Sequence, residues 1–370
     1  MRVGPYDATP EMFAALALNA WDSWRVLLRG GLPPGPGKTP AEIAAVALRR
    51  NAGTVLAAGA GHFRFLWVAD FGKSLSGAWG TLGTEYLAGQ IERITDESAR
   101  LGRVPSCLRA ARGFDMPWHR GDGLPWLVFS HAELARRRGR GPDEGRRRAL
   151  QGLLERYEAR WVEPGGLLSE EMAGDWVDTV RRPSSTYNNL CVLMMLRRAP
   201  ELGLRSRTDP DAFAAALLKD RWRGDFFRDH ARTEALSVDA VVAALYLGSF
   251  PRAVLEPAAA RLEALRLDEP YPMLCAAGDY DPRSVPLLTI LASGYHRARW
   301  LHLGLMWLNG LKRLGRDASR GRAAAESLFL RHRAVPEAVT DDGAPYRSFF
   351  LSCENGLTMA AGQYLELIGA

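Results

Sequence analysis

The chain has 370 residues, of which 47% are hydrophobic and 24% are charged, and its formal net charge is +6. This composition is typical of a globular protein with room for a large core. Forty-four of the 48 basic residues are Arg and they are scattered along the chain. The Arg clusters at 136–140 and 146–148 therefore indicate solvated surface rather than a nucleic-acid site.

Cysteine spacing and hydropathy exclude several further classes. The four cysteines are far apart and form no CxxC pair, which argues against a zinc site and a disulfide framework. We expect no membrane span, because no stretch has 18 uninterrupted apolar residues, and residues 1–7 lack the apolar run of a signal peptide. The seven His form no HxxxH or HxH pair, so we expect neither a metal nor another cofactor. We predict a cytoplasmic protein.

Apolar periodicity and helix-start signals predict about twelve helices, with weak strand signals between them. Thr39-Pro40-Ala41-Glu42 has the pattern of a capping box, and Ser184 or Ser185 can cap the apolar helix that begins near Leu190. The predicted helices span 8–30, 39–58, 75–94, 124–137, 142–161, 190–204, 209–219, 237–247, 251–265, 284–314, 317–333 and 355–368.

Short turns and long loops alternate between these helices, whereas most connections in an ordinary helical bundle are short. The long loops span 60–72, 102–123, 162–183, 220–236, 268–284 and 334–353. Six long loops and six helix pairs suggest a closed ring of helical hairpins, because one hairpin cannot bury its apolar faces alone. We therefore predict an all-α (α/α)6 toroid formed by a single domain, residues 1–370, whose long loops make an active-site cleft at one end.

The long loops are rich in Trp and carboxylates. Indole rings stack on the C–H groups of a sugar and carboxylates accept its hydroxyl protons, while glycosidic cleavage needs one protonated and one ionised carboxyl group. The loop residues of these kinds are Trp67, Asp70, Asp115, Trp118, His119, Arg120, Asp122, Trp176, Asp178, Trp222, Asp225, Asp279, Asp281, Glu337, Asp341 and Asp342.

Three motifs, together with the hairpin count, resemble the six-hairpin (α/α)6 glycosidases over roughly residues 10–368. The motifs are Phe65-Leu66-Trp67-Val68-Ala69-Asp70-Phe71, Trp176-Val177-Asp178 before a helix, and Val335-Pro336-Glu337-Ala338-Val339-Thr340-Asp341-Asp342-Gly343 before the last helix. The most similar groups are the glucosidase part of glycogen debranching enzymes, neutral invertases, trehalases and the mannosylglycerate hydrolase type. Ala69 replaces the Arg that usually precedes the aspartate of the first motif.

This resemblance implies an inverting glycoside hydrolase with Asp178 as general acid and Glu337 as general base. Such a pair needs a carboxyl separation of about 6.5–9.5 Å, so that one water fits between them. Trp176 is expected to help keep Asp178 protonated, since apolar surroundings raise the pKa of a carboxyl group. Glu354 is a rival for the base, and it can instead cap the last helix or bind a sugar hydroxyl.

The remaining candidate residues are expected to hold the sugar. By the same resemblance, Trp67 and Asp70 would bind the non-reducing sugar, and the other residues would line the same pocket. The substrate-binding candidates are Trp67, Asp70, Trp118, His119, Arg120, Asp122, Trp176, Tyr187, Asn188 and Glu354.

Two other functions remain open at this point. Sugar epimerases use similar helical barrels but depend on His for proton transfer at carbon, and these loops favour carboxylates. A non-catalytic carbohydrate-binding barrel is the third possibility, because Arg is missing before Asp70. The expected partner is a small carbohydrate, an α-glucoside or related sugar, with no nucleic acid and no membrane. The sequence does not indicate an oligomeric state.

Overall fold

The structure, a computed structural model, describes most of the chain. The described residues are 2–3, 6–7, 10–28, 35–61, 63–109, 112–114, 121–177, 180–281, 284–285, 297–348 and 352–370. Within them, no helix combines the length and apolar character needed to cross a membrane.

Six helices form a closed inner ring, in which each helix packs against the next and the last packs against the first. The inner helices are α3 (Val68–Leu82), α5 (Gly123–Arg138), α7 (Thr186–Arg198), α9 (Val238–Leu247), α12 (Leu301–Arg313) and α14 (Thr358–Ile368). Glycines allow the closing contact between α3 and α14, because a Cβ on Gly77 would lie 1.9 Å from the carbonyl oxygen of Gly362. The ring predicted from the alternation of loops is therefore confirmed.

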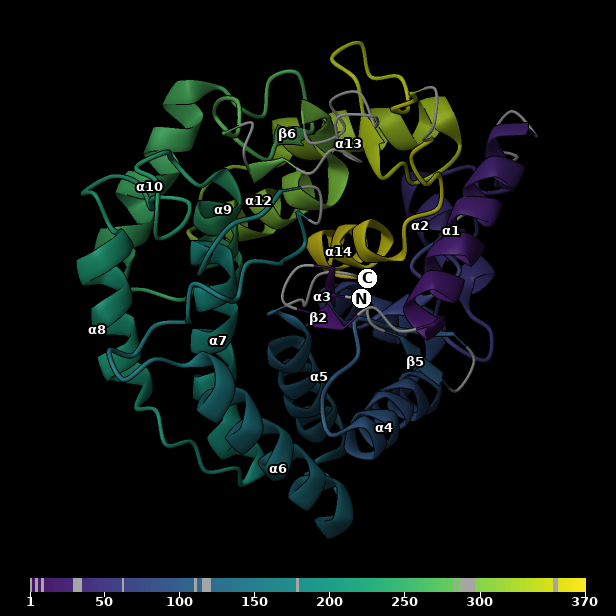
Figure 1. The fold of residues 1–370 in the computed structure, drawn as a ribbon. Helices are drawn as coiled ribbons and strands as arrows, with labels where there is room; N and C mark the ends of the chain where they lie inside the picture. Colours follow the sequence, from purple (N-terminus) through teal and green to yellow (C-terminus); the bar gives the residue numbers. More distant parts are fainter. Residues whose placement is uncertain are drawn as a thin grey trace.

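Six further helices surround the ring, and Figure 1 shows α4, α6, α8, α10 and α13 at the rim of the molecule. The outer helices are α2 (Pro40–Asn51), α4 (Thr84–Leu101), α6 (Glu144–Trp161), α8 (Pro210–Arg221), α10 (Arg252–Leu265) and α13 (Ser319–His332). A 3-10 turn, Ala199–Leu202, extends α7. Each outer helix packs on an inner helix, so the apolar core lies between the two layers.

The two ends of the ring differ in how the helices are connected. Each inner helix follows a long loop, and each of the first five is joined to the next outer helix by a shorter connection. We call the end with the long loops the loop end and the opposite end the turn end. Late residues of all six inner helices line one pocket of about 490 Å³ at the turn end, so the inner helices run parallel to one another.

Two short antiparallel sheets each join two of the long loops. One sheet joins β3 (Leu66–Trp67), β4 (Cys107–Arg109) and β5 (Arg112–Phe114), and the other joins β6 (Met273–Leu274), β7 (Arg299–Trp300) and β8 (Ala338–Val339). A two-stranded ribbon of β1 (Arg2–Val3) and β2 (Tyr6–Asp7) lies at the N-terminus.

Three predictions about the helices need correction. The segment 75–94 is not one helix, because Gly83, with φ +80°, ends α3 and begins α4. The first helix, α1 (Pro10–Leu28), lies outside the ring and exposes Trp21 and Trp24. The last part of the predicted helix 284–314 is α12, which begins only at Leu301, and residues 286–296 lie outside the described residues.

Candidate functional site at the loop end of the ring

The described site candidates all lie where inner helices begin. Trp67 immediately precedes α3, Asp122 precedes α5, Tyr187 and Asn188 lie in the first turn of α7, and Glu337 and Glu354 lie in the loop before α14. Trp176 lies in the loop before α7. Asp178, Trp118, His119 and Arg120 fall outside the described residues.

Asp70 is not on a loop, as the sequence suggested, but in the first turn of α3. The helix begins at Val68 without a side-chain cap, so its start carries no recognisable signal in the sequence. Trp67, just before it, is buried in a small cluster with Phe65 and Cys107, and its ring meets Phe63 edge-on. The first motif therefore fixes the start of an inner helix against the β3–β4–β5 sheet.

Glu337 is buried, with 5% of its surface exposed, at the start of strand β8. Its backbone N–H donates to the carbonyl oxygen of Glu354 (2.8 Å), and the N–H of Glu354 donates to the Glu337 carboxylate (2.9 Å). Burial, followed by the charge of Glu337, raises the pKa of the nearby Cys353 thiol to about 12. That thiol is therefore not a nucleophile at neutral pH.

The Glu354 carboxylate is occupied by backbone donors. Its two oxygens accept the N–H of Gly61 at 3.1 and 2.9 Å, and one of them also accepts the N–H of Asn355 at 3.1 Å. A Cβ on Gly59 or Gly61 would lie 2.3 or 2.7 Å from the Glu354 side chain, so only glycine permits this close approach. Glu354 thus ties the loop before α3 to the loop before α14.

Trp176 connects two of the long loops. Its indole N–H donates to Asp239 on α9 at 2.7 Å, and its ring packs edge-on against Trp300 and His302, with centroids 5.4 and 4.7 Å away. Trp300 lies on β7, which pairs with Ala338 next to Glu337. Trp176 is therefore linked through β7 to strand β8, which begins one residue after Glu337.

A buried charge cluster lies beneath the loop that contains Trp176. The guanidinium of Arg182 contacts three carboxylates, Asp175 at 2.8 Å, Asp229 at 2.8 Å and Asp239 at 2.6 Å, and the hydroxyl of Ser237 donates to the last two. Asp175 and Arg182 are the first and last residues of the segment 175–182, which includes residue 178. The cluster therefore fixes both ends of this segment.

The electrostatics of this cluster follow from burial of three acids around one cation. Burial raises the pKa of Asp175, and raises that of Asp229 to about 6, against the attraction of Arg182. Burial acts in the same direction on Asp239, but Arg182 and hydrogen bonds from Ser237 and Trp176 keep its pKa below the ordinary value. No sequence pattern indicates this cluster, because its members come from three separate segments and share no motif.

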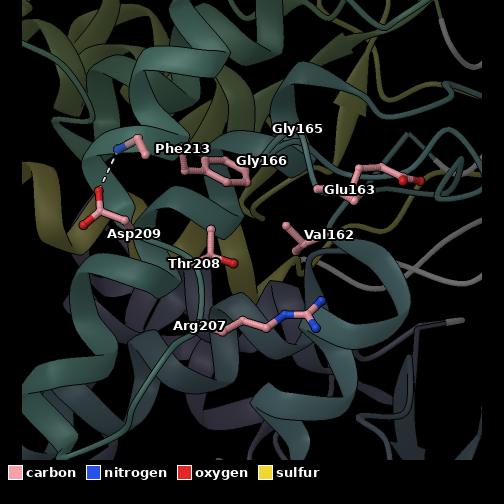
Figure 2. A pocket seen from close by; sticks show the side chains of 10 residues that line it. Val162, Glu163, Gly165, Gly166, Arg207, Thr208, Asp209 and Phe213 are labelled. Carbon is pink, nitrogen blue, oxygen red and sulfur yellow. Dashed lines mark hydrogen bonds between the residues drawn. The ribbon is translucent and has the colours of Figure 1, made fainter.

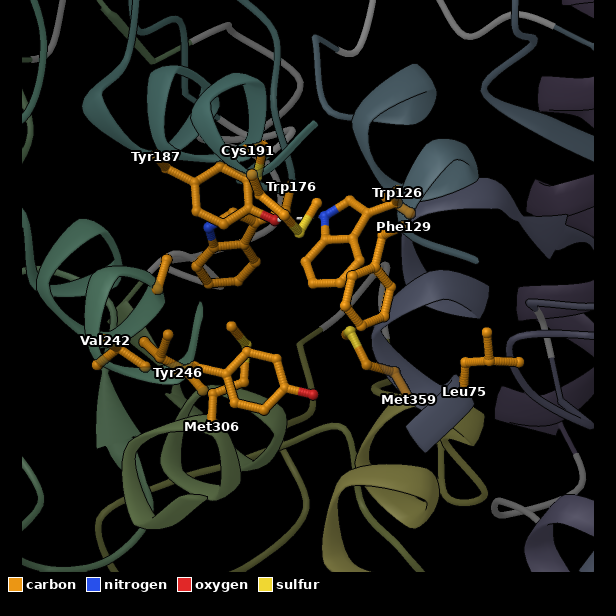
Figure 3. Close-up of a cluster of buried hydrophobic side chains, with 14 of the residues drawn as sticks. Leu75, Trp126, Phe129, Trp176, Tyr187, Cys191, Val242, Tyr246, Met306 and Met359 are labelled. Carbon is orange, nitrogen blue, oxygen red and sulfur yellow. Dashed lines mark hydrogen bonds between the residues drawn. The ribbon is translucent and has the colours of Figure 1, made fainter. Parts of the chain in front are cut away.

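The inner face of the ring is lined by aromatic and thioether side chains. Figure 3 shows Tyr187 and Trp176 on one side facing Trp126 and Phe129 on the other, with Met359 nearby. The Trp126 indole donates to the Tyr187 hydroxyl at 3.4 Å, which in turn donates to Asp122 at 3.4 Å. These side chains belong to the buried hydrophobic core, and the two hydrogen bonds connect the few polar groups among them.

Asn188 has a mainly structural environment. Its side-chain amide donates to the carbonyl oxygen of Gly174 at 2.9 Å, and its own backbone N–H donates to the Ser185 hydroxyl at 3.2 Å. Of the two predicted caps, Ser184 and Ser185, the structure confirms Ser185, and the helix begins at Thr186 instead of near Leu190.

Another pocket, of about 440 Å³, lies away from the candidate residues (Figure 2). It lies between the loop after α6 and the start of α8, and its lining includes Glu163, Arg207 and Asp209. Asp209 there caps α8 through backbone N–H groups. None of the candidate residues that the structure describes lines this pocket.

Comparison with known proteins identifies the fold. No family model and no curated protein sequence matches the chain. Among solved structures, a glycosidase variant in complex with glucose matches with a TM-score of 0.66 and 15% identity, covering 89% of this chain and 95% of that one. A rhamnosidase from Klebsiella oxytoca with rhamnose bound matches with a TM-score of 0.65 and 12% identity, covering 91% and 66%.

A GH78 family rhamnosidase of Bacillus sp. GL1 matches with a TM-score of 0.63 and 17% identity, over 88% of this chain and 34% of that longer one. The fold is therefore that of the glycosidase helical barrels, as the sequence motifs suggested. At these identities the likeness establishes the fold alone, and the chemistry has to be argued from the site.

Proposed function

We propose that this protein is an inverting glycoside hydrolase that acts on a small α-glucoside or related sugar, with Asp178 as general acid and Glu337 as general base. The observation that carries the proposal is the junction of Trp176, Trp300 and His302, which joins the loop of Asp178 to strand β7, the partner of the strand that follows Glu337. Both loops precede inner helices at the loop end of the ring, which supports a shared site for the two carboxyl groups that hydrolysis of a glycosidic bond requires.

The described contacts favour Glu337 over Glu354 as the base. The carboxylate of Glu354 accepts several backbone N–H groups from two loops, so moving it toward a water would break the connection between them. In this position Glu354 serves as an anchor between the two loops. Glu337 precedes the short strand β8, which fixes its backbone. Glu337 is therefore the better candidate for the base that activates a water.

Glucose and rhamnose, each bound to a structural neighbour, define the first substrates to try. The purified protein is incubated with a panel of α-glucosides and α-rhamnosides, released reducing sugar is measured, and the first-formed anomer is followed by NMR. Inversion at the anomeric carbon supports the two-carboxylate mechanism. A retained configuration would contradict the assignment of Glu337 as a base.

Variants test the two roles separately. Asp178→Asn and Glu337→Gln should each lower kcat/KM on the natural glycoside by about 10²–10⁴-fold, the usual contribution of general acid or base catalysis. A glycosyl fluoride needs little protonation of its leaving group, so it should partly rescue Asp178→Asn but not Glu337→Gln. The matched control is Glu163→Gln in the outer pocket of Figure 2, which should retain wild-type turnover.

A sugar epimerase is the second candidate, because His302 packs against Trp176 at the loop end and an imidazole can transfer a proton at carbon. The same NMR spectra distinguish the two reactions. Release of reducing sugar without a change at any other carbon supports the hydrolase, whereas deuterium incorporation into an intact sugar supports the epimerase.

A further inference from the structure

Lys73, on inner helix α3, is a buried cation without an adequate partner. Only 1% of its side chain is exposed, and its ammonium has no hydrogen-bond acceptor among the described residues. The nearest carboxylate oxygen, on Asp122, is 3.9 Å away, which is too long for a hydrogen bond. Lysines are rarely fully buried, and leaving an ammonium unsatisfied in the interior is costly.

The groups around Lys73 come from three successive inner helices. Its ammonium lies 6.0 Å from the ring centre of Trp126 on α5 and 5.4 Å from that of Tyr187 on α7. Figure 3 shows these two rings facing one another inside the ring of helices. Asp122, just before α5, is fully buried, and one of its carboxylate oxygens has no hydrogen-bond partner in the described part of the chain.

A second lysine shows that an unsatisfied ammonium is not general in this protein. Lys312, on inner helix α12 at the turn end, donates a hydrogen bond of 3.0 Å to the carbonyl oxygen of Leu367. The unsatisfied lysine is therefore at the loop end, and the satisfied lysine is at the opposite end.

The geometry points to Lys73 and Asp122 as a subsite for two neighbouring hydroxyl groups of a neutral pyranose, an inference that rests on the proposed function. One hydroxyl oxygen accepts a hydrogen bond from the Lys73 ammonium, and its neighbour donates to the free oxygen of Asp122. The aromatic faces of Trp126 and Tyr187 cover the C–H surface of the same sugar.

Charge selects the class of ligand. Lys73 and Asp122 carry opposite charges 3.9 Å apart, so the pair is neutral as a unit. A neutral diol satisfies both free groups, whereas a sugar carboxylate would satisfy Lys73 and face the Asp122 carboxylate at close range. The subsite therefore accepts a neutral sugar and rejects the corresponding uronic acid.

The first test is a cycle of substrate and protein changes. Lys73→Met removes the ammonium but keeps a similar chain length, and we expect kcat/KM on the parent glycoside to fall about 10–100-fold, as for a lost hydrogen bond to a charged group. Each monodeoxy analogue of that glycoside is then assayed with both proteins. The analogue that lacks the hydroxyl bound by Lys73 should have a lowered kcat/KM with the wild type. Its kcat/KM should not fall further with Lys73→Met.

The control is Lys219→Met, which removes an exposed lysine from outer helix α8 and should behave as wild type. If Lys73→Met instead loses the same factor on every analogue, Lys73 has only a structural role and the inference is overturned.

The second test does not depend on turnover. Binding of glucose, rhamnose and glucuronate is measured by calorimetry for the wild type and for Asp122→Asn, which keeps the shape of Asp122. Without the Asp122 charge, Lys73 is an uncompensated cation, so the preference for glucose over glucuronate should shift at least tenfold toward glucuronate. An unchanged preference overturns the subsite, including in the case where Lys73→Met fails to fold. If the wild type hydrolyses no glycoside but this shift occurs, the hydrolase proposal fails and the subsite stands.

Discussion

The two ends of the helical ring contain the same kinds of charged residue in opposite surroundings. At the loop end, Arg182 is buried against three aspartates and Lys73 is buried beside Asp122. At the turn end, four arginines line an open pocket with three glutamates, and Arg136 among them is 49% exposed.

This difference in burial indicates at which end the charged residues matter most for stability and function. Exposed ion pairs cost and gain little, because water screens them. Buried charges are costly unless they are paired, and perturbed charged groups in clefts are often functional. The loop end is therefore the end where substitution of a charged residue should have a large effect.

The largest expected effect is that of Arg182→Met. This change leaves Asp175, Asp229 and Asp239 buried without their cation. Loss of one partner of a buried ion pair costs about 3–5 kcal/mol, and here three carboxylates lose the same partner. Thermal melts followed by circular dichroism at pH 7 should show a strongly lowered Tm. A Tm within a degree or two of wild type would show that the cluster contributes nothing to stability.

An intermediate effect is expected from pH at Asp229. Its folded-state pKa of about 6 lies above the ordinary value of 3.8, because burial disfavours the charged form. The stability contributed by protonated Asp229 is complete below about pH 3.8 and is lost as pH rises through 6, at up to about 1.4 kcal/mol per pH unit.

Asp229→Asn retains the acceptor for Arg182 but does not titrate. The free energy of unfolding of wild type, relative to this variant, should therefore fall between pH 4 and pH 7. Chemical denaturation at several pH values measures the difference, and a difference that stays constant across this range would contradict the raised pKa.

The ring and its loop end were predictable from sequence, because alternation of loop length is visible in the order of Gly, Pro and apolar runs. The start of α3 was not, since Val68 follows Trp67 without a capping side chain, and Asp70 was therefore expected on a loop. The break at Gly83 was also missed, because one glycine does not interrupt the apolar periodicity of 75–94.

The polar groups of the loop end were predicted less well than the fold. Arg182 meets partners 47 and 57 residues further along the chain, and no local pattern announces such contacts. Lys73 did leave a signal, because Asp70 and Lys73 are the only charged residues of α3, and Lys73 lies among apolar residues in the first half of that helix. The placement of Asp178 stays a prediction.

The smallest expected effect is that of Arg136→Met at the turn end, which matches Arg182→Met in chemistry and differs in burial. Arg136 forms ion pairs with Glu133 and, at 3.5 Å, with Glu201. Half of its side chain is exposed, so water replaces both contacts when it is removed, and exposed pairs are worth about 0–1 kcal/mol. We expect a Tm close to wild type and unchanged hydrolysis, measured under the conditions used for Arg182→Met.

Raising the salt concentration should reduce the remaining difference in Tm between Arg136→Met and wild type, because salt screens exposed charges. If Arg136→Met lost as much stability as Arg182→Met, burial would not be what distinguishes the two ends, and the case for a functional loop end would rest on Lys73 and the carboxylates alone.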